Sequence, residues 1–177
     1  LKHFKLSPEK KTVFITGGSL GAKNINQGIM HALPQLLEQN IQVIWQTGKS
    51  FTEQVDKKSG YISQFIYEMN LAFNAADIVI SRAGAISISE ISALKKPSIL
   101  VPSPNVTDDH QTKNAEALSS KGAAILIKDH AYLALGEAII ELITNPAEME
   151  KLSHSIAAFA KPKSTAEIVD LIKKELR

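Results

Sequence analysis

The sequence contains no cysteine among its 177 residues. This absence excludes disulfide bonds and thiolate metal sites, and it is typical of proteins from a reducing compartment. The sequence also lacks an excess of charge of one sign, because 20 basic and 18 acidic residues give a formal net charge of +2. Such a balance excludes the basic stripe that characterises nucleic-acid-binding proteins, so we predict no nucleic-acid partner.

Long apolar runs are missing as well. No run approaches the roughly 20 residues that a membrane-spanning helix needs, and the first residues lack the pattern of a secretory signal peptide. The sequence begins at Leu1 without Met and reaches its first strand-like run at residue 12. This start favours a fragment of a longer protein, and a tag remnant or a processed terminus is the alternative.

Short apolar runs alternate with helical patterns along the chain. The runs are rich in Val, Ile and Leu, which favours parallel strands that are covered on both faces. They span residues 12–16, 42–46, 62–66, 78–81, 98–101 and 124–127. We therefore predict an α/β fold, a Rossmann-like doubly wound parallel sheet in one domain over residues 1–177, with its ligand at the carboxyl ends of the strands.

Helical patterns fill the intervals between these runs. They span residues 21–39, 51–58, 70–75, 85–94, 110–121, 132–144, 147–160 and 165–176. Pro34 lies inside the first helix, so we expect a kink or two shorter helices there. Residues 107–109 are expected to cap the helix from residue 110. The last helix carries an apolar stripe that suits either its own core or a partner: Ile168, Leu171, Ile172 and Leu176.

The turn from Gly17 to Ala22 follows the first strand and opens the first helix. Gly17 and Gly18 permit a tight turn and a close ligand approach, and Ser19 offers a hydroxyl and an N–H. Free N–H groups and the helix dipole at such a place favour phosphate. The spacing matches neither G-x-G-x-x-G nor a P-loop, and a plain strand-to-helix turn is the alternative.

A second turn of this kind spans residues 81–90. Gly84 and Ala85 again allow close approach, and Arg82 could pair with a phosphate. The carboxylate of Glu90 could accept two hydrogen bonds from the hydroxyls of a ribose. Two such turns in one α/β unit predict a bound nucleotide diphosphate. The alternative is that Glu90 is an ordinary acid of an early helical turn and Arg82 a surface charge.

Two further segments carry polar or main-chain groups at strand ends. In residues 102–114, His110 and Gln111 suit the hydroxyls of a sugar, although a capped helix with incidental polar residues is the alternative. No second His lies at ligand spacing from His110, so we predict no metal site. Residues 64–69 could read a base through the main chain, or they could be ordinary core that includes Met69. The spacing reveals no catalytic triad and no pair of catalytic carboxylates.

Five segments in order resemble the C-terminal half of the MurG family, the bacterial UDP-N-acetylglucosamine:lipid I N-acetylglucosaminyltransferases. They are residues 17–22, 44–48, 65–69, 76–90 and 108–115. The resemblance covers the chain from about Lys11 onward. It implies the C-terminal, donor-binding half of a GT-B glycosyltransferase, whose N-terminal half binds the acceptor, meets the membrane and carries the catalytic histidine.

The resemblance also implies a role for each candidate residue in binding UDP-GlcNAc. Ile66 would read uracil through its main chain, Met69 would pack beside the nucleoside, and Glu90 would bind the ribose. His110 and Gln111 would contact the GlcNAc hydroxyls. The residues implied around the diphosphate are Gly17, Gly18, Ser19, Gly21, Arg82, Gly84 and Ala85.

The reaction implied is inverting transfer of GlcNAc from UDP-GlcNAc to lipid I, which forms a β-1,4 bond during peptidoglycan synthesis. We expect no cofactor and no metal, because N–H groups and helix dipoles would stabilise the leaving diphosphate. No catalytic residue is expected within this chain, and the full-length enzyme would lie on the cytoplasmic face of the inner membrane. The alternatives are another GT-B UDP-sugar transferase, a UDP-GlcNAc epimerase, or a non-catalytic nucleotide-sugar binding module.

Overall fold

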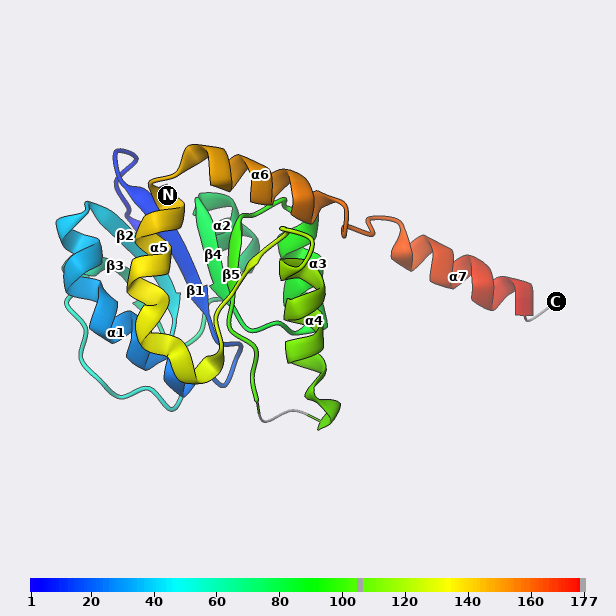
Figure 1. The fold of residues 1–177 in the computed structure, drawn as a ribbon, viewed down its shortest axis with the longest axis horizontal. Coiled ribbons are helices and arrows are strands. Elements are labelled where there is room, and N and C mark those ends of the chain that lie inside the picture. The colour runs from blue at the N-terminus through cyan, green and yellow to red at the C-terminus, as the bar shows by residue number, and fades with distance from the viewer. Residues whose placement is uncertain (105–106, 176–177) are drawn as a thin grey trace.

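A computed structural model describes residues 1–104 and 107–175, without the side chains of residues 57, 107 and 165. Its strands form one parallel sheet in the order β3-β2-β1-β4-β5-β6 (Figure 1). The strands are β1 (Lys11–Thr16), β2 (Ile41–Gln46), β3 (Gly60–Ser63), β4 (Ile78–Ser81), β5 (Ser98–Leu100) and β6 (Ile125–Leu126). Because the strand order reverses between β1 and β4, the sheet is doubly wound and has its switch point there, which confirms the predicted fold class.

Helices connect the strands and cover both faces of the sheet. The α-helices are α1 (Lys23–Glu38), α2 (Met69–Ala75), α3 (Ala85–Ala93), α4 (His110–Ser119), α5 (Leu135–Ile143), α6 (Pro146–Ala157) and α7 (Ser164–Glu175). Short 3₁₀ segments are η1 (Lys2–Phe4), η2 (Lys57–Ser59), η3 (Thr107–Asp109) and η4 (Asp129–Ala134). The proline in α1 does not divide that helix, so the expectation of two shorter helices is wrong.

Successive residues of each central strand enter opposite halves of the core. In β1, Val13 and Ile15 pack with α1 and α5 on one face, whereas Phe14 packs with α2, α3 and α4 on the other. All three side chains are fully buried. The ring of Phe14 meets Phe73 of α2 edge to face, with 5.0 Å between the ring centres. This burial on both faces is the reason that the strands are continuously apolar.

One polar link holds α1 to β2 inside the core. The Nε1–H of Trp45 donates to Oδ1 of Asn26 at 3.1 Å, and Nδ2 of Asn26 donates to the carbonyl of Thr47 at 2.8 Å. Trp45 is fully buried and Asn26 is 5% exposed. Because buried polar groups are costly unless they are paired, this amide fixes how the first helix sits on the second strand.

The crossover before β3 differs from the prediction. Residues 51–58 do not form the predicted helix; the chain is irregular until η2. Phe51 and Val55 both pack against the core on the α1 side, and a spacing of four does not distinguish a helix from a loop that contacts the core twice. The strand predicted at residues 62–66 begins at Gly60 instead, where a Cβ atom would lie 2.1 Å from the carbonyl of Val43.

The N-caps of α6 and α4 differ, and only the cap of α4 is among the sequence predictions. Asn145 caps α6, because its side chain accepts from the N–H of Glu148 at 3.1 Å. Asp109 occupies the N-cap position of α4, but its side chain makes no capping bond. It has a left-handed backbone (φ 51°) and accepts from the hydroxyl of Thr112 at 2.6 Å instead. Within the predicted loop 102–114, residues 105 and 106 lie outside the described residues.

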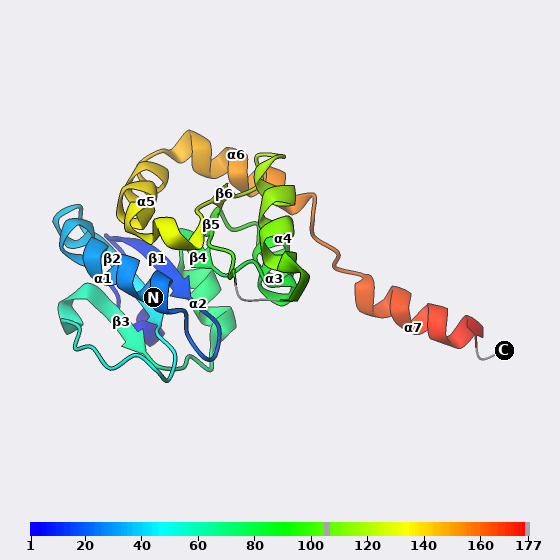
Figure 2. The ribbon, with the colours of Figure 1, turned by 60° about the horizontal axis from the view of Figure 1, so that its bottom comes forward.

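Helix α7 extends away from the rest of the chain in two views (Figures 1 and 2). Its apolar stripe is therefore not part of the domain's own core. The exposed fractions are 57% for Ile168, 60% for Leu171 and 54% for Ile172, and Leu176 lies outside the described residues. No helix within residues 1–104 and 107–175 combines the length and the apolar character that crossing a membrane requires.

The polar link in the core generates a stability prediction. Asn26→Ala leaves the indole N–H of Trp45 and the carbonyl of Thr47 without their partner, which should lower the free energy of unfolding by about 2–4 kcal/mol. Chemical denaturation followed by circular dichroism measures this change. Gln27→Ala, next to it on the same helix, is the control and should change the free energy little; equal losses for the two variants would contradict the account.

Candidate functional site

The candidate segments all leave the sheet from one row of paired residues. Thr16 of β1 lies opposite Gln46 of β2 on one side and Ser81 of β4 on the other. The row continues to Ser63 of β3 and to Leu100 of β5. Neighbouring strands lie about 4.8 Å apart, so the turns that follow these residues start side by side. The structure thus brings the predicted segments together at the carboxyl edge of the sheet.

The turn between β1 and α1 is held tightly against β2. A Cβ atom on Gly17 would lie 2.4 Å from the amide nitrogen of Ala22, and one on Gly21 would lie 2.2 Å from the carbonyl of Thr47. Gly18 and Gly21 have left-handed backbones, with φ of 84° and 81°. Ser19 lies exposed at the tip of the turn. Only glycine fits at positions 17, 18 and 21, and the resulting turn places the start of α1 at the carboxyl edge of the sheet.

Helices α1 and α3 begin at the switch point without caps of their own. Their N-cap residues are Ala22 and Gly84, neither supplies a capping side chain, and neither helix has an acidic residue in its first turn. Space around Gly84 is open, since a Cβ atom there would meet nothing within 4 Å, and Ala85 next to it is exposed. The first N–H groups of both helices are therefore positioned to bind an external anion.

The structure places Arg82 differently from the phosphate contact that the sequence predicts. Its Nη1 donates to the carbonyls of Val101 at 3.0 Å and Pro102 at 3.2 Å, and it pairs with Oδ1 of Asp129 at 2.5 Å. The side chains of Arg82 and Asp129 are 16% and 14% exposed. The guanidinium is thus paired inside the protein, and the prediction that it contacts phosphate stays a prediction.

Glu90 lies about one and a half turns into α3 and is half-buried. Burial raises the pKa of its carboxyl above the ordinary value for glutamate. No hydrogen bond or ion pair to its side chain is found among the described residues. A partly desolvated carboxylate of this kind is suited to accept hydrogen bonds from the hydroxyls of a ligand.

The base-reading and sugar-binding candidates flank the two turns. The N–H of Ile66 donates to Oε1 of Gln46 at 2.9 Å, so a base could be read there through the carbonyl oxygen of Ile66, not its N–H. Met69 begins α2 and is half-buried. Oε1 of Gln111 accepts from the N–H of Ser103 at 2.9 Å, whereas His110 is exposed in the first turn of α4.

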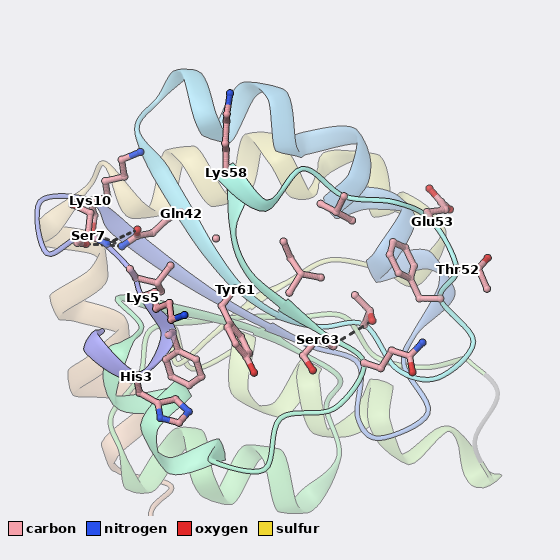
Figure 3. A pocket seen from close by; sticks show the side chains of 18 residues that line it. His3, Lys5, Ser7, Lys10, Gln42, Thr52, Glu53, Lys58, Tyr61 and Ser63 are labelled. Carbon is pink, nitrogen blue, oxygen red and sulfur yellow. Dashed lines mark hydrogen bonds between the residues drawn. The ribbon is translucent and has the colours of Figure 1, made fainter.

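A large cavity lies away from these turns. It has a volume of about 1040 Å³ and runs along β3, between the N-terminal residues and the segment after β2 (Figure 3). Lys5, Lys10 and Lys58 lie on its wall together with Tyr61. Its lining includes Gln64, the first residue of the segment 64–69, but none of the individual residues implied to bind UDP-GlcNAc. In the part of the chain that the structure describes, no three His, Asp or Glu side chains gather as metal ligands do.

Sequence reasoning missed two polar residues at this edge, Gln46 and Asp129. Gln46 joins the two sides of β2, because its Nε2 donates to the carbonyl of Gly18 at 3.0 Å while its Oε1 accepts from Ile66. Asp129 contacts both Arg82 and Asn24. The signal for Gln46 is a polar residue that ends an otherwise apolar strand. Asp129 has no comparable signal, since its partners lie 47 and 105 residues away.

Comparison with known proteins identifies the family. Residues 12–172 match the model of the glycosyltransferase family 28 C-terminal domain. The chain belongs to glycosyltransferase family 28. The expected resemblance to the MurG family is confirmed by relatives and by a solved structure.

The curated relatives are transferases of one kind. A protein of Flavobacterium psychrophilum is 47% identical over 98% of this chain and 49% of its own length, and one of Cytophaga hutchinsonii is 48% identical over 96% and 47%. Each is named a UDP-N-acetylglucosamine--N-acetylmuramyl-(pentapeptide) pyrophosphoryl-undecaprenol N-acetylglucosamine transferase. The chain spans about half the length of these relatives.

Solved structures show the same architecture. The crystal structure of Acinetobacter baumannii MurG superposes with a TM-score of 0.81 at 30% identity, and the match covers 98% of this chain and 52% of that one. S. aureus MnaA, solved with UDP, superposes with a TM-score of 0.69 at 15% identity over 95% and 47% of the two chains. The second match shows only that the two proteins share the fold.

The burial of Glu90 generates a prediction with a defined sign. Because its folded-state pKa is raised, the folded state binds this proton more tightly than the unfolded state does. The stability that follows from the raised pKa is present below the unfolded pKa and is lost as the pH rises through the folded pKa. Glu90→Gln should therefore raise the melting temperature at neutral pH, and the difference should vanish below the ordinary pKa of glutamate.

Scanning calorimetry of the two proteins across pH checks this expectation. Glu141→Gln, an exposed change on α5, is the control and should show no such pH-dependent difference. A melting temperature that Glu90→Gln lowers at neutral pH would mean that the ionised carboxylate stabilises the free protein.

Proposed function

We propose that the chain is the donor-binding part of an enzyme that transfers GlcNAc from UDP-GlcNAc to lipid I, with inversion, to form lipid II in peptidoglycan synthesis. The names of relatives that are 47–48% identical support this substrate pair. The observation that carries the proposal is that α1 and α3 both begin without caps and follow β1 and β4, which are adjacent strands at the switch point. They suit a diphosphate and, with Glu90 nearby in α3, a nucleoside diphosphate.

The charge of the diphosphate would be balanced mainly by the backbone. Each helix N-terminus carries roughly half a positive charge, and its free N–H groups donate hydrogen bonds. As the bond to the sugar breaks, negative charge grows on the departing diphosphate, and these fixed dipoles stabilise it without having to reorganise. Gly17, Gly18 and Gly21 let the ligand approach the main chain, while Ser19 adds a hydroxyl.

The remaining contacts would orient the two ends of the donor. The carbonyl of Ile66 would accept a hydrogen bond from uracil, Met69 would pack beside the nucleoside, and Glu90 would hold the ribose hydroxyls. His110 and Gln111 would contact the sugar. The oxygen of Gln111 already accepts from Ser103, which leaves its NH₂ group to donate to a sugar hydroxyl.

The acceptor site and the catalytic base would belong to the half of the relatives that this chain does not span. We propose that this half packs against the exposed apolar stripe of α7 and meets the inner membrane from the cytoplasmic side, where lipid I is presented. Alone, the chain would bind the donor and transfer nothing. Detectable transfer to lipid I by the chain alone would contradict this division of roles.

Calorimetric titration with UDP-GlcNAc, UDP and GDP tests donor binding. We expect binding that requires uridine, and we expect Glu90→Ala to weaken it at least tenfold, since a lost charged hydrogen bond costs about 1.5–3 kcal/mol. Glu141→Ala on α5 is the control and should bind as the unaltered chain does. Equal affinity for GDP, or binding that survives Glu90→Ala, would overturn the proposed donor site.

Metal independence is a separate expectation. Because helix N-termini supply the positive charge, the affinity for UDP should be the same in the presence of a chelator and in the presence of Mg²⁺. The same titration measures it under both conditions. A large loss with chelator that Mg²⁺ restores would show that the diphosphate needs a cation.

A further inference from the structure

Asp129 contacts side chains from both turns at the switch point. It is the first residue of η4, three residues beyond β6. Its Oδ1 accepts from Nη1 of Arg82 at 2.5 Å, and its Oδ2 accepts from Nδ2 of Asn24 at 2.6 Å. The carbonyl of Asp129 also accepts from Nδ2 of Asn24, at 3.3 Å. We call these contacts the Asp129 bridge.

The two arms of the Asp129 bridge end at the two helix N-termini. Asn24 is the second residue of α1, and Arg82 lies two residues before Gly84, the N-cap of α3. The guanidinium also donates to the carbonyls of residues 101 and 102, just beyond β5. The bridge therefore connects segments that follow four strands, β1, β4, β5 and β6. Among the described residues, no backbone hydrogen bond joins α1 directly to α3.

The burial of the bridge makes it a fixed connection. Both charged side chains are shielded, with exposed fractions of 16% for Arg82 and 14% for Asp129. Solvent and salt weaken exposed ion pairs far more than shielded ones. Because each carboxylate oxygen has its own donor, either arm of the bridge can be removed without the other.

We propose that Asp129 is a positioning residue, which sets the spacing and direction of the α1 and α3 N-termini so that both can bind one diphosphate. The proposal rests on the proposed donor-binding function. Arg82 acts through Asp129 and supports the turn before α3. The backbone N–H groups make the phosphate contacts.

The competing arrangement has a different consequence. If Arg82 turned toward the phosphate, it would leave Asp129, and removing the carboxylate would release Arg82 for that contact. UDP affinity would then be unchanged or higher in Asp129→Ala. If the bridge positions the helices, the same change must lower UDP affinity, and Arg82→Met must have no further effect once the carboxylate is gone.

Amide hydrogen exchange and UDP binding together test the proposal. The variants are Asp129→Ala, Arg82→Met, their double mutant, Asn24→Ala and, as control, Asp170→Ala on the projecting α7. In the ligand-free chain, Asp129→Ala should speed exchange about tenfold or more in the hydrogen-bonded amides of Gly21, Asn26 and Ile88, and leave β2 unchanged. Asn24→Ala, which removes one arm only, should affect the α1 residues alone.

Binding supplies a second readout that a general loss of stability would not reproduce. Asp129→Ala should weaken UDP about tenfold and uridine little, and the double mutant should bind UDP no worse than the weaker single variant. Asp170→Ala should match the unaltered chain in both measurements.

Three outcomes separate the ideas. Unchanged exchange in either helix turn overturns the Asp129 bridge, as does UDP affinity that Asp129→Ala leaves intact while Arg82→Met abolishes it. Failure of the unaltered chain to bind UDP overturns the proposed function instead, and the exchange comparison then decides the bridge by itself. If Asp129→Ala does not fold, exchange in Asn24→Ala tests the bridge. Faster exchange at the start of α1 supports it, and unchanged exchange there overturns it.

Discussion

The parallel register of the sheet is the constraint on which the candidate site depends. Ser63, Gln46, Thr16, Ser81 and Leu100 form one continuous row across five strands, and each candidate segment begins within two residues of a member of that row. A shift of one residue in any strand would move its turn by about 3.3 Å and reverse its side chains. Such a shift would also exchange that strand's side chains between the two halves of the core, where close packing fits each one in its own place. The same strand register therefore determines both the packing of the core and the position of the candidate site.

Charged side chains contribute little positive charge to the candidate site at the two turns. The most prominent cation of the two turns, Arg82, is largely neutralised by Asp129, and both helices that start there lack acidic residues in their first turns. The proposed site would thus rely on aligned peptide dipoles, whose direction is set by the fold and does not depend on the rotamer of a long side chain. Gln46 has a related role on the other side of β1, where one buried amide connects the glycine turn to the loop that carries Ile66.

Features that depend on local chemistry could be predicted from the sequence. Apolar runs predicted the strands, and the glycines after β1 and β4 predicted both turns. Errors arose where distant contacts decide the outcome. Residues 51–58 resemble a helix in spacing, yet Phe51 lies against Trp45 with 5.1 Å between ring centres, and the chain stays irregular. Glycine at position 60 usually weakens a strand, but the close approach of Val43 leaves no room for a side chain there. Asp129 could not be found, because nothing in its neighbourhood of the sequence marks partners 47 and 105 residues away.

The link between Trp45 and Asn26 also gives the molecule a built-in optical property. Trp45 is the single tryptophan of the sequence, and its side chain is shielded from water between α1 and β2. All indole emission therefore comes from one buried side chain, whose N–H donates to Asn26. Trp45 lies one residue before Gln46, whose side chain contacts Gly18 on one side and Ile66 on the other. The emission wavelength of Trp45 therefore reports whether water reaches the contact between α1 and β2, and no added fluorophore is needed.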